Sequence, residues 1–324
     1  MSENYPIDFV VTWVDGNDPV WQAEKAKYSP NKNADNRNVR FRDWDNMQYW
    51  FRAVEKFAPW VNKIHFVTYG HLPKWLNIDN PKLNIAKHSD FIPQKYLPTF
   101  SSQPIELNLH RINGLAERFV YFNDDMFLLR PVKRELFFAG KDCLPTDFAI
   151  TSTISTTTKE DMMPFIKLNC VTILNGHFDK KEQMKKHFSK WVNLAYGWNA
   201  LRNLIFYGQH RFKGFANNHL AFSFLKSEYE DIWEKEYESL DDTSSHKFRS
   251  KLDLDNWLIR YWQLTRGNFY PIGRHVKGKV YEIYNGVEQN QAMPMICIND
   301  NDNVDFEPMK ERIKQAFDKI LPEK

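Results

Sequence analysis

Three adjacent polar residues that could do chemistry, Asn123, Asp124 and Asp125, lie inside the apolar stretch FVYFNDDMFLLRP from Phe119 to Pro131. An unpaired carboxylate is costly to bury, so two carboxylates between apolar runs require positive charge nearby. Mg²⁺ supplies that charge, prefers carboxylate ligands and keeps coordination positions open for phosphate oxygens. A helix N-cap or an exposed turn would also account for the pair. By themselves, the residues favour a metal-dependent enzyme that acts on a phosphorylated ligand.

Further candidate residues lie in the second half of the chain. Asn299 and Asp300 follow the short apolar run MICI, although a simple turn or a calcium-like loop has a similar composition. His219 precedes an expected helix, where a structural histidine is the alternative interpretation. The guanidinium of Arg249 suits a phosphate, but an arginine on a charged helix beside Asp253 is more often a solvated member of an ion pair.

The composition limits the class of protein. The chain has 324 residues, of which 42% are hydrophobic and 26% charged, as in folded proteins of one large domain or two smaller ones. A net charge of +3 is too small to indicate a nucleic-acid-binding surface. The aromatic content of 15% indicates a Trp- and Phe-rich core more than a sugar-binding surface. The sequence contains no glycine-rich dinucleotide motif, phosphate-binding P-loop, nucleophile elbow or zinc-ligand spacing.

Cysteine usage and hydropathy bear on where the protein works. Its three cysteines are far apart in the sequence, which fits a reducing compartment better than a disulfide framework. The first residues, MSENYPIDFVV, lack the basic and apolar segments of a signal peptide. No run approaches the roughly 18 apolar residues of a membrane-spanning helix. We therefore expect a cytoplasmic protein, with peripheral association at the inner face of the membrane left open.

Strands alternate with helices in the first part of the chain. Apolar, β-branched runs predict strands at 7–16, 63–70, 83–88 and 118–124. Between them, one helix is predicted from Met47 to just before Pro59, and another from Phe100 to Leu115 with Ser102 as its N-cap. This alternation predicts an α/β fold of the Rossmann-like kind, with a mostly parallel sheet and helices on both faces.

In a mostly parallel sheet, ligands collect at the carboxyl ends of the strands. Asp15, Gly70 and the acidic triplet at 123–125 all fall at such ends. The predicted sheet would therefore bring the triplet to the edge of a ligand-binding crevice.

The rest of the chain is harder to interpret. Residues 141–215 look less regular and include the Thr-rich stretch TSTISTTTKED, which suggests a helical or irregular insertion or lid that binds the acceptor, or a plain surface excursion. Helical spacing returns over 218–262, strands are expected at KVYEIY and MICIND, and a closing helix is expected from Glu307 to Ile320. We expect residues 1–140 and 216–324 to form the catalytic α/β domain together.

Four sequence blocks resemble a known family. In chain order they begin with IDFVVTWVDGNDPVW, RFRDWDNMQYWF, NNHLAFSFLK and ICINDNDNVDFEP, and the second continues to FVYFNDDMFL. Their order and content resemble the four conserved regions of the Stealth family of sugar-1-phosphate transferases. Bacterial members make capsular or exopolysaccharides, and the animal relative is the N-acetylglucosamine-1-phosphotransferase that tags lysosomal enzymes. The resemblance implies a glycosyltransferase A-like form of the α/β fold.

The resemblance also implies an activity and a set of site residues. A UDP-sugar would donate a hexose or N-acetylhexosamine 1-phosphate to a hydroxyl group of a glycan or glycolipid acceptor, releasing UMP. Asp15 departs from the animal relative, which has Asn there. Positions that match the family blocks, and that we expect near the donor, are Trp13, Val14, Asp15, Gly16, Arg40, Asp43, His88, Ser101, Ser102, Glu106, His110, Arg111, Asn123, Asn299 and Asp300.

The expected chemistry assigns roles to four residues. We expect Mg²⁺ or Mn²⁺ on Asp124 and Asp125, the phosphate on Arg249, and His219 as general base, since an unperturbed histidine has a pKa of about 6.5. Two rival functions remain: a metal-dependent glycosyltransferase that releases UDP, and a non-catalytic carbohydrate-binding module. The expected partners are a UDP-sugar and a glycan acceptor, without nucleic acid, and the sequence leaves self-association open.

Overall fold

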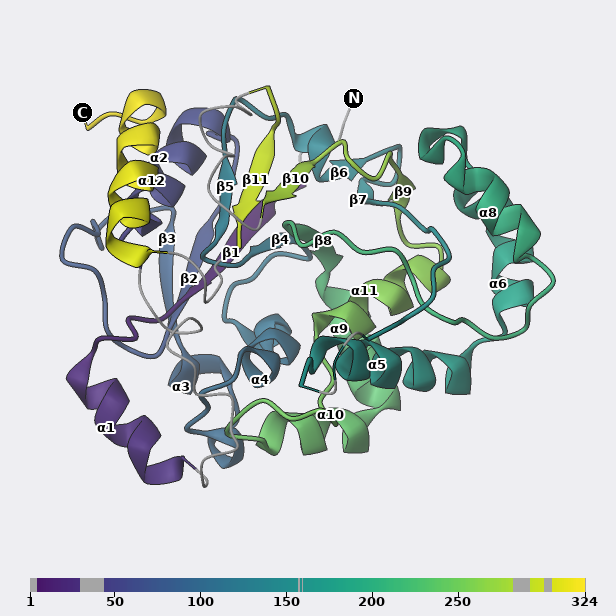
Figure 1. Cartoon of the computed structure of the whole chain (residues 1–324), viewed down its shortest axis with the longest axis horizontal. Helices are drawn as coiled ribbons and strands as arrows, with labels where there is room; N and C mark the ends of the chain where they lie inside the picture. Colours follow the sequence, from purple (N-terminus) through teal and green to yellow (C-terminus); the bar gives the residue numbers. More distant parts are fainter. Residues whose placement is uncertain are drawn as a thin grey trace.

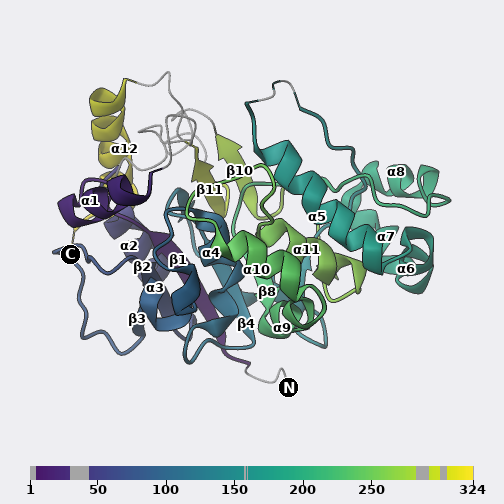
Figure 2. The ribbon, with the colours of Figure 1, turned by 90° about the horizontal axis from the view of Figure 1, so that it is seen from below.

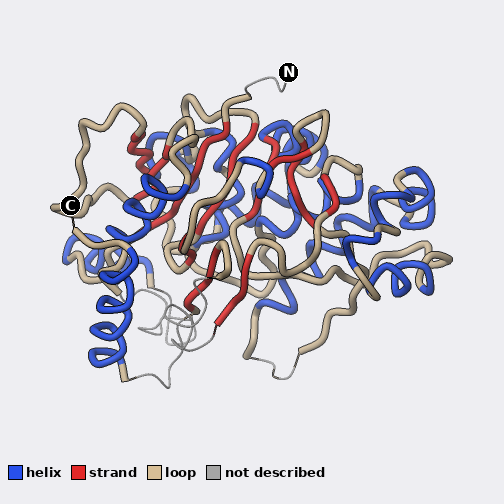
Figure 3. The backbone as a smooth tube through the Cα atoms, turned by 90° about the horizontal axis from the view of Figure 1, so that it is seen from above, coloured by secondary structure: helices blue, strands red, loops and turns tan. Residues whose placement is uncertain are grey.

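The computed structural model describes residues 5–29, 44–156, 158, 160–281, 292–299 and 305–323. Its central feature is a five-stranded sheet, seen in the middle of the molecule in Figures 1 and 3. The strands lie in the order β3 (Leu83–Lys87), β2 (Ile64–Thr68), β1 (Ile7–Trp13), β4 (Arg118–Phe122) and β8 (Phe222–Leu225). The first four are parallel, and β8 pairs antiparallel with β4. The predicted mostly parallel α/β fold is confirmed.

Both faces of the sheet are covered by helices, which explains why β1 is apolar at almost every position. Successive side chains of a strand point to opposite faces. Phe9 and Val11 pack in one core cluster with residues of α2 (Met47–Phe57) and α12 (Phe306–Ile320). Val10 lies in the other cluster.

The second cluster contains most of the remaining helices. At its centre is α11 (Asn256–Thr265), in which every residue is buried. Residues of α5 and α9 join it in this cluster, and α4 and α10 pack against each other beside it. The bounds of these helices and of neighbouring α1 and α3 are α1 (Pro19–Tyr28), α3 (His88–Phe91), α4 (Ser102–Leu107), α5 (Met163–His177), α9 (Lys226–Lys235) and α10 (Tyr237–Ser245).

A small second sheet brings the end of the chain beside the acidic triplet. In it, β11 (Met295–Ile298) pairs antiparallel with β5 (Met126–Leu128) and parallel with β10 (Gly278–Tyr281). Gly278 has a φ of +153°, and a Cβ atom there would lie 1.9 Å from the carbonyl oxygen of Met295. Only glycine permits this close approach of the two backbones. A third small sheet contains β6 (Phe138–Ala139), β7 (Leu144–Asp147) and β9 (Tyr270–Pro271).

Three short helices form one end of the molecule. They are α6 (Lys180–Lys186), α7 (Phe188–Trp191) and α8 (Asn199–Ile205). Figure 1 places α6 and α8, and Figure 2 all three, at the right-hand edge, away from the central sheet.

Several details differ from the sequence predictions. The helix predicted over 100–115 is α4 followed by a 3₁₀ turn, Leu109–Arg111, and its N-cap is Ser101 rather than Ser102. The region 141–215, expected to be a helical or irregular insertion, contains helices α5 to α8 joined by irregular segments, and residues of α5 lie in the core. The segment 218–262, predicted to be helical, contains strand β8 because Phe222–Leu225 pairs with the edge of the sheet.

The other predicted elements before residue 125, and the closing helix, are confirmed. The part of KVYEIY beyond Tyr281 lies outside the described residues. Among the helices that the structure describes, none combines the length and the apolar character needed to cross a bilayer.

Candidate active site

A cleft of about 1230 Å³ lies where β1 and β4 end. This is the position at which a mostly parallel sheet binds ligands. Chain segments far apart in the sequence line it, including the triplet after β4 and the segment between α10 and α11. The predicted residues that line the cleft are Trp13, Val14, His88, Ser101, Ser102, Glu106, Asn123, Asp124, Asp125, His219, Arg249 and Asn299.

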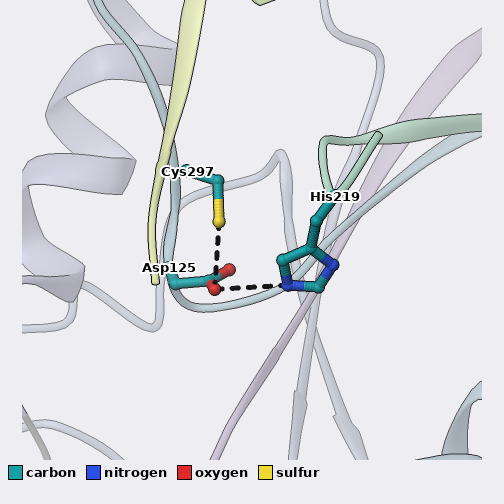
Figure 4. A group of neighbouring side chains, drawn as sticks. All are labelled: Asp125, His219 and Cys297. Atoms are coloured by element: carbon teal, nitrogen blue, oxygen red, sulfur yellow. Dashed lines mark hydrogen bonds and ion pairs between the residues drawn. The ribbon is translucent and has the colours of Figure 1, made fainter. Parts of the chain in front are cut away.

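Asp125 lies between a thiol and an imidazole, as Figure 4 shows. Its Oδ2 accepts a hydrogen bond from the Sγ of Cys297 at 3.1 Å and lies 3.4 Å from Nε2 of His219. The backbone N–H of Ile298 donates to the carbonyl oxygen of Asp125 at 2.8 Å, so the pairing of β5 with β11 fixes this residue. Oδ1 of Asp125 is buried and has no hydrogen-bond partner among the described residues.

The acidic pair is less buried than the sequence suggests. Asp124 is exposed, and the side chain of Asp125 keeps 22% of its surface accessible. The expectation that both carboxylates lie inside the protein is therefore wrong, because the chain turns at the sheet edge and opens them to the cleft. Both remain at the carboxyl end of β4, where the sequence places them.

The charge of Asp125 controls its two neighbours. Burial lowers the pKa of His219, but the attraction of the Asp125 carboxylate outweighs this and leaves that pKa above its usual value. Burial, together with the same carboxylate, raises the pKa of Cys297 well above the ordinary range. Cys297 is therefore a neutral thiol that donates to Asp125. Nδ2 of Asn123 lies 3.4 Å from the same Nε2 atom of His219.

The residues fit a hard divalent cation. The partnerless Oδ1 of Asp125 and the neighbouring carboxylate of Asp124 are the oxygen ligands that Mg²⁺ and Mn²⁺ prefer. Atoms of Asp125, His219 and Cys297 also lie within 4.8 Å of one another, a set more typical of zinc. The Sγ of Cys297 is engaged in the hydrogen bond to Oδ2 of Asp125, which leaves the carboxylate oxygens as the better ligands for a hard cation.

A second acidic group forms the floor of the cleft. Glu106 is buried, and the hydroxyl group of Tyr121 donates to its Oε1 at 3.4 Å. Burial raises the pKa of Glu106, and the nearby Arg249 partly opposes the shift. Asp255, the N-cap of α11, has a pKa raised to about 7 by burial and by the charge of Glu106. Burial thus disfavours the charged form of both acids.

Arg249 reaches the cleft from the segment that joins α10 to α11. Its Nη2 donates to Oγ of Ser102 at 3.2 Å, and its Nε donates to Oε1 of Gln103 at 3.3 Å. Asp253 shapes this segment by accepting from Nδ1 of His246 at 2.6 Å and from the backbone N–H of Ser250 at 2.7 Å. The alternative that Arg249 lies on an exposed, charged helix is wrong.

Other predicted residues lie outside the cleft lining. His110 stacks on Tyr229 with ring centroids 5.6 Å apart, and burial lowers its pKa to about 3. Arg111 lies over the ring of Trp233 at 4.7 Å. Asp15 shapes the turn after β1, and its backbone N–H donates to Nε2 of His71 at 2.7 Å.

Gly16 belongs to the same turn after β1 and does not line the cleft. His88 does line it, and burial lowers its pKa to about 3, so the ring is neutral. Arg40, Asp43 and Asp300 lie outside the described residues.

The cleft also contains cations that the sequence interpretation missed. Lys167 projects from α5, and Arg274 donates from Nε to Oδ1 of Asn218 at 3.1 Å, beside His219. Lys279 lines the cleft from β10. The stretch GRHVKGK is a visible basic signal around Arg274, but nothing in the sequence indicates that α5 packs against the site.

Comparison with known proteins agrees with this picture. The sequence models of Stealth protein conserved regions 1 and 2 match residues 5–33 and 40–144. The chain is 42% identical to the capsular polysaccharide phosphotransferase WcwK of Streptococcus pneumoniae, over 100% of this chain and 98% of that protein. It is 38% identical to the exopolysaccharide phosphotransferase cps2G of Lactiplantibacillus plantarum, over 100% of this chain and 96% of that protein.

Among solved structures, the galactosyltransferase LgtC matches 97% of this chain and 96% of its own, with 8% sequence identity and a TM-score of 0.38. Membership of a family rests on the sequence matches, which extend over essentially the whole chain at high identity. Both matched regions contain residues that line the cleft. This chain belongs to the Stealth family.

Proposed function

We propose that this protein transfers a hexose or N-acetylhexosamine 1-phosphate from a UDP-sugar to a hydroxyl group of a glycan acceptor and releases UMP, in capsular or exopolysaccharide synthesis. Relatives of the whole chain carry the name of polysaccharide phosphotransferases. The observation that carries the proposal is the meeting of Asp125, His219 and Arg249 in one cleft. These are an anionic, a basic and a cationic group, which phosphoryl transfer needs together.

The cations of the cleft suit a diphosphate. Arg249 is the group we assign to the transferred phosphate, because a guanidinium can bind two of its oxygens at once. Arg274 and Lys279 add positive charge elsewhere in the lining of the same cleft. Negative charge shifts within the diphosphate during transfer, and donors that are already in place stabilise it without reorganisation.

The proposed step is a direct displacement at phosphorus. His219 takes the proton of the acceptor hydroxyl, and that oxygen forms a bond to the phosphorus that bears the sugar. The bond from this phosphorus to the oxygen bridging the two phosphates breaks, and UMP leaves with the electron pair. His219 must be neutral to accept the proton, so the pKa raised by Asp125 makes it a stronger base that acts above that pKa.

Asp124 and Asp125 are the residues we assign to Mg²⁺ or Mn²⁺. When bound, such an ion would supply positive charge to the diphosphate oxygens. Cys297 supports the arrangement by donating a hydrogen bond to Oδ2 of Asp125, while Oδ1 has no hydrogen-bond partner among the described residues.

The proposal also assigns the donor and acceptor sites to different parts of the chain. Residues 1–140 and 216–324 supply the donor site and the proposed catalytic residues. The insertion at 141–215 would serve the acceptor, and its residues Asp161, Met163 and Lys167 line the cleft.

Analysis of the released nucleotide tests the proposal. The protein is incubated with a panel of UDP-sugars, Mg²⁺ and a polysaccharide acceptor, and the nucleotide is identified. UMP together with sugar-linked phosphate in the product supports phosphotransfer. Release of UDP would mean that the protein is a glycosyltransferase, and acceptor binding without nucleotide release would mean a carbohydrate-binding module.

A further inference from the structure

The end of the molecule formed by α6, α7 and α8 has an unusual surface. Leu194 is 96% exposed, Trp198 is 86% exposed and Ile205 is 77% exposed. Leu201 and Leu204 are also among the exposed large apolar side chains. We call these five residues the α8 surface. Single exposed apolar residues are ordinary, but five within twelve positions mark a surface that contacts something apolar.

The apolar side of α8 faces outward because its other side is firmly held. Asn203 is fully buried, and its Nδ2 donates to the carbonyl oxygens of Ala149 and Trp191, at 2.6 Å in both cases. Its Oδ1 accepts from the backbone N–H of Thr151 at 2.8 Å. With this residue anchored inside, helical geometry directs Trp198 and Ile205 to the opposite side.

The surrounding sequence is strongly basic. Residues 180–213 contain eight lysines and arginines and one glutamate, a net charge of +7, whereas the whole chain carries +3. The remainder of the chain therefore carries −4. Three lysines of α6, Lys181, Lys185 and Lys186, are exposed, as is Arg202 within α8. Positive charge is thus concentrated around the α8 surface.

This combination identifies the occupant by its chemistry. A second copy of the chain meeting the same surface would bring two segments of charge +7 together, which is unfavourable. An anionic lipid bilayer instead offers apolar depth for Leu and Ile, an interface that favours Trp, and headgroups that attract Lys and Arg by about 1 kcal/mol each. We propose that the α8 surface docks this protein on membranes that contain anionic lipids. The proposal does not depend on the catalytic chemistry.

Vesicle binding by the full chain tests the proposal. Sedimentation with vesicles of phosphatidylcholine alone is compared with vesicles that also contain phosphatidylglycerol. We expect binding to the anionic vesicles that weakens as salt concentration rises. The double substitution Trp198→Ser with Ile205→Ser should reduce the affinity for vesicles about tenfold or more, since it removes two apolar side chains that the bilayer would bury. Replacing Lys181, Lys185 and Lys186 by Gln should reduce it and remove most of its dependence on salt.

Val20→Ser is the matched control, because Val20 is 70% exposed on α1, away from the α8 surface. It should leave vesicle binding unchanged, and the melting temperatures of all variants should stay close to that of the wild type. Equal affinity of the wild type and the Trp198/Ile205 variant, or no preference for anionic vesicles, would overturn the proposal. So would a wild-type dimer that the double substitution makes monomeric without any change in vesicle binding.

Discussion

Asp8 and Asp125 lie near opposite ends of neighbouring strands, and the two carboxylates differ in burial and in hydrogen bonding. Asp8, near the start of β1, is completely buried. Its Oδ1 accepts from Nδ2 of Asn62 at 2.7 Å and from the backbone N–H of Lys63 at 3.1 Å. Its Oδ2 accepts from Nε2 of His65 at 2.9 Å and from the backbone N–H of Ala116 at 2.8 Å.

Asp125, just beyond the end of β4, is partly exposed and has an oxygen without a hydrogen-bond partner among the described residues. A carboxylate with all its positions occupied can only hold the structure together. A carboxylate that faces a cleft with a free position can bind a ligand at the cost of some stability. The comparison teaches that hydrogen-bond satisfaction, more than burial, separates a structural acid from a functional one.

The largest expected effect comes from Asp125→Asn. We expect turnover to fall by roughly 10³–10⁴-fold, since charge stabilisation by a metal site contributes several kcal/mol and each 1.36 kcal/mol corresponds to about tenfold. The melting temperature should stay near that of the wild type. Measured turnover with and without chelator checks this, with Cys297→Ser as a control that retains the hydrogen-bond donor and much of the activity. Full activity of Asp125→Asn in excess chelator would remove the metal assignment.

His219→Ala should lower turnover by about 10²–10⁴-fold, the range expected for a lost general base. KM for the UDP-sugar should change little, because the imidazole faces the acceptor in the proposed step. Turnover and KM are to be measured together with the pH profile, in which wild-type activity should rise with pH through a pKa above the usual histidine value. Normal turnover with weakened donor binding would make His219 a binding residue instead.

Asp8→Asn should have the opposite profile to the Asp125 variant. We expect the free energy of unfolding to fall by about 3–5 kcal/mol, because the new amide group would face hydrogen-bond donors in a buried site. The kcat of the protein that remains folded should be close to normal. Denaturant unfolding and active-site-normalised turnover measure the two quantities. Loss of turnover without loss of stability would show that the role of Asp8 is not structural.

Arg249→Lys is expected to lower kcat by roughly 10- to 100-fold, since lysine retains the charge but not the two-pronged geometry. KM for the donor should change less, and the melting temperature should hardly change because Arg249 is only partly buried. Measuring kcat, KM and the melting temperature of this single variant tests the prediction. A kcat near that of the wild type would exclude Arg249 from the site.

The smallest expected effect is a loss of stability at low pH. Burial raises the pKa of Asp8, but hydrogen bonds from His65, Asn62 and Ala116 outweigh it, so that pKa lies below its ordinary value of 3.8. The contribution of Asp8 to stability is therefore complete above pH 3.8 and is lost as the pH falls through the lowered pKa. The difference in unfolding free energy between wild type and Asp8→Asn should narrow below that pH. If the difference in unfolding free energy stays constant as the pH falls below 3.8, the pKa of Asp8 does not control this part of the stability.

Much of the fold could be predicted from local patterns. Strand β1 and helix α2 have strong apolar periodicity, and the family blocks contain most of the residues that line the cleft. The helix predicted over 100–115 was too long because residues 108–111 tighten into a 3₁₀ turn against α9 and α10. The choice between helical and irregular structure in the segment 141–215 could not be made from sequence, because the apolar residues of α5 are spread around the helix without a clear stripe and α5 is stabilised by packing against α11.

The sequence by itself determined that two carboxylates follow a buried strand and that a parallel sheet places them at a ligand-binding edge. Only the tertiary structure decided that Asp125 meets His219 and Cys297, that Lys167 and Arg274 join the same cleft, and that His110 does not. The physical reason is that strand periodicity and turn chemistry depend on residues close in the chain. The pairing of β4 with β8, the pairing of β5 with β11 and the contact of Asp125 with Cys297, 172 residues along the chain, depend instead on how sheets and helices pack together.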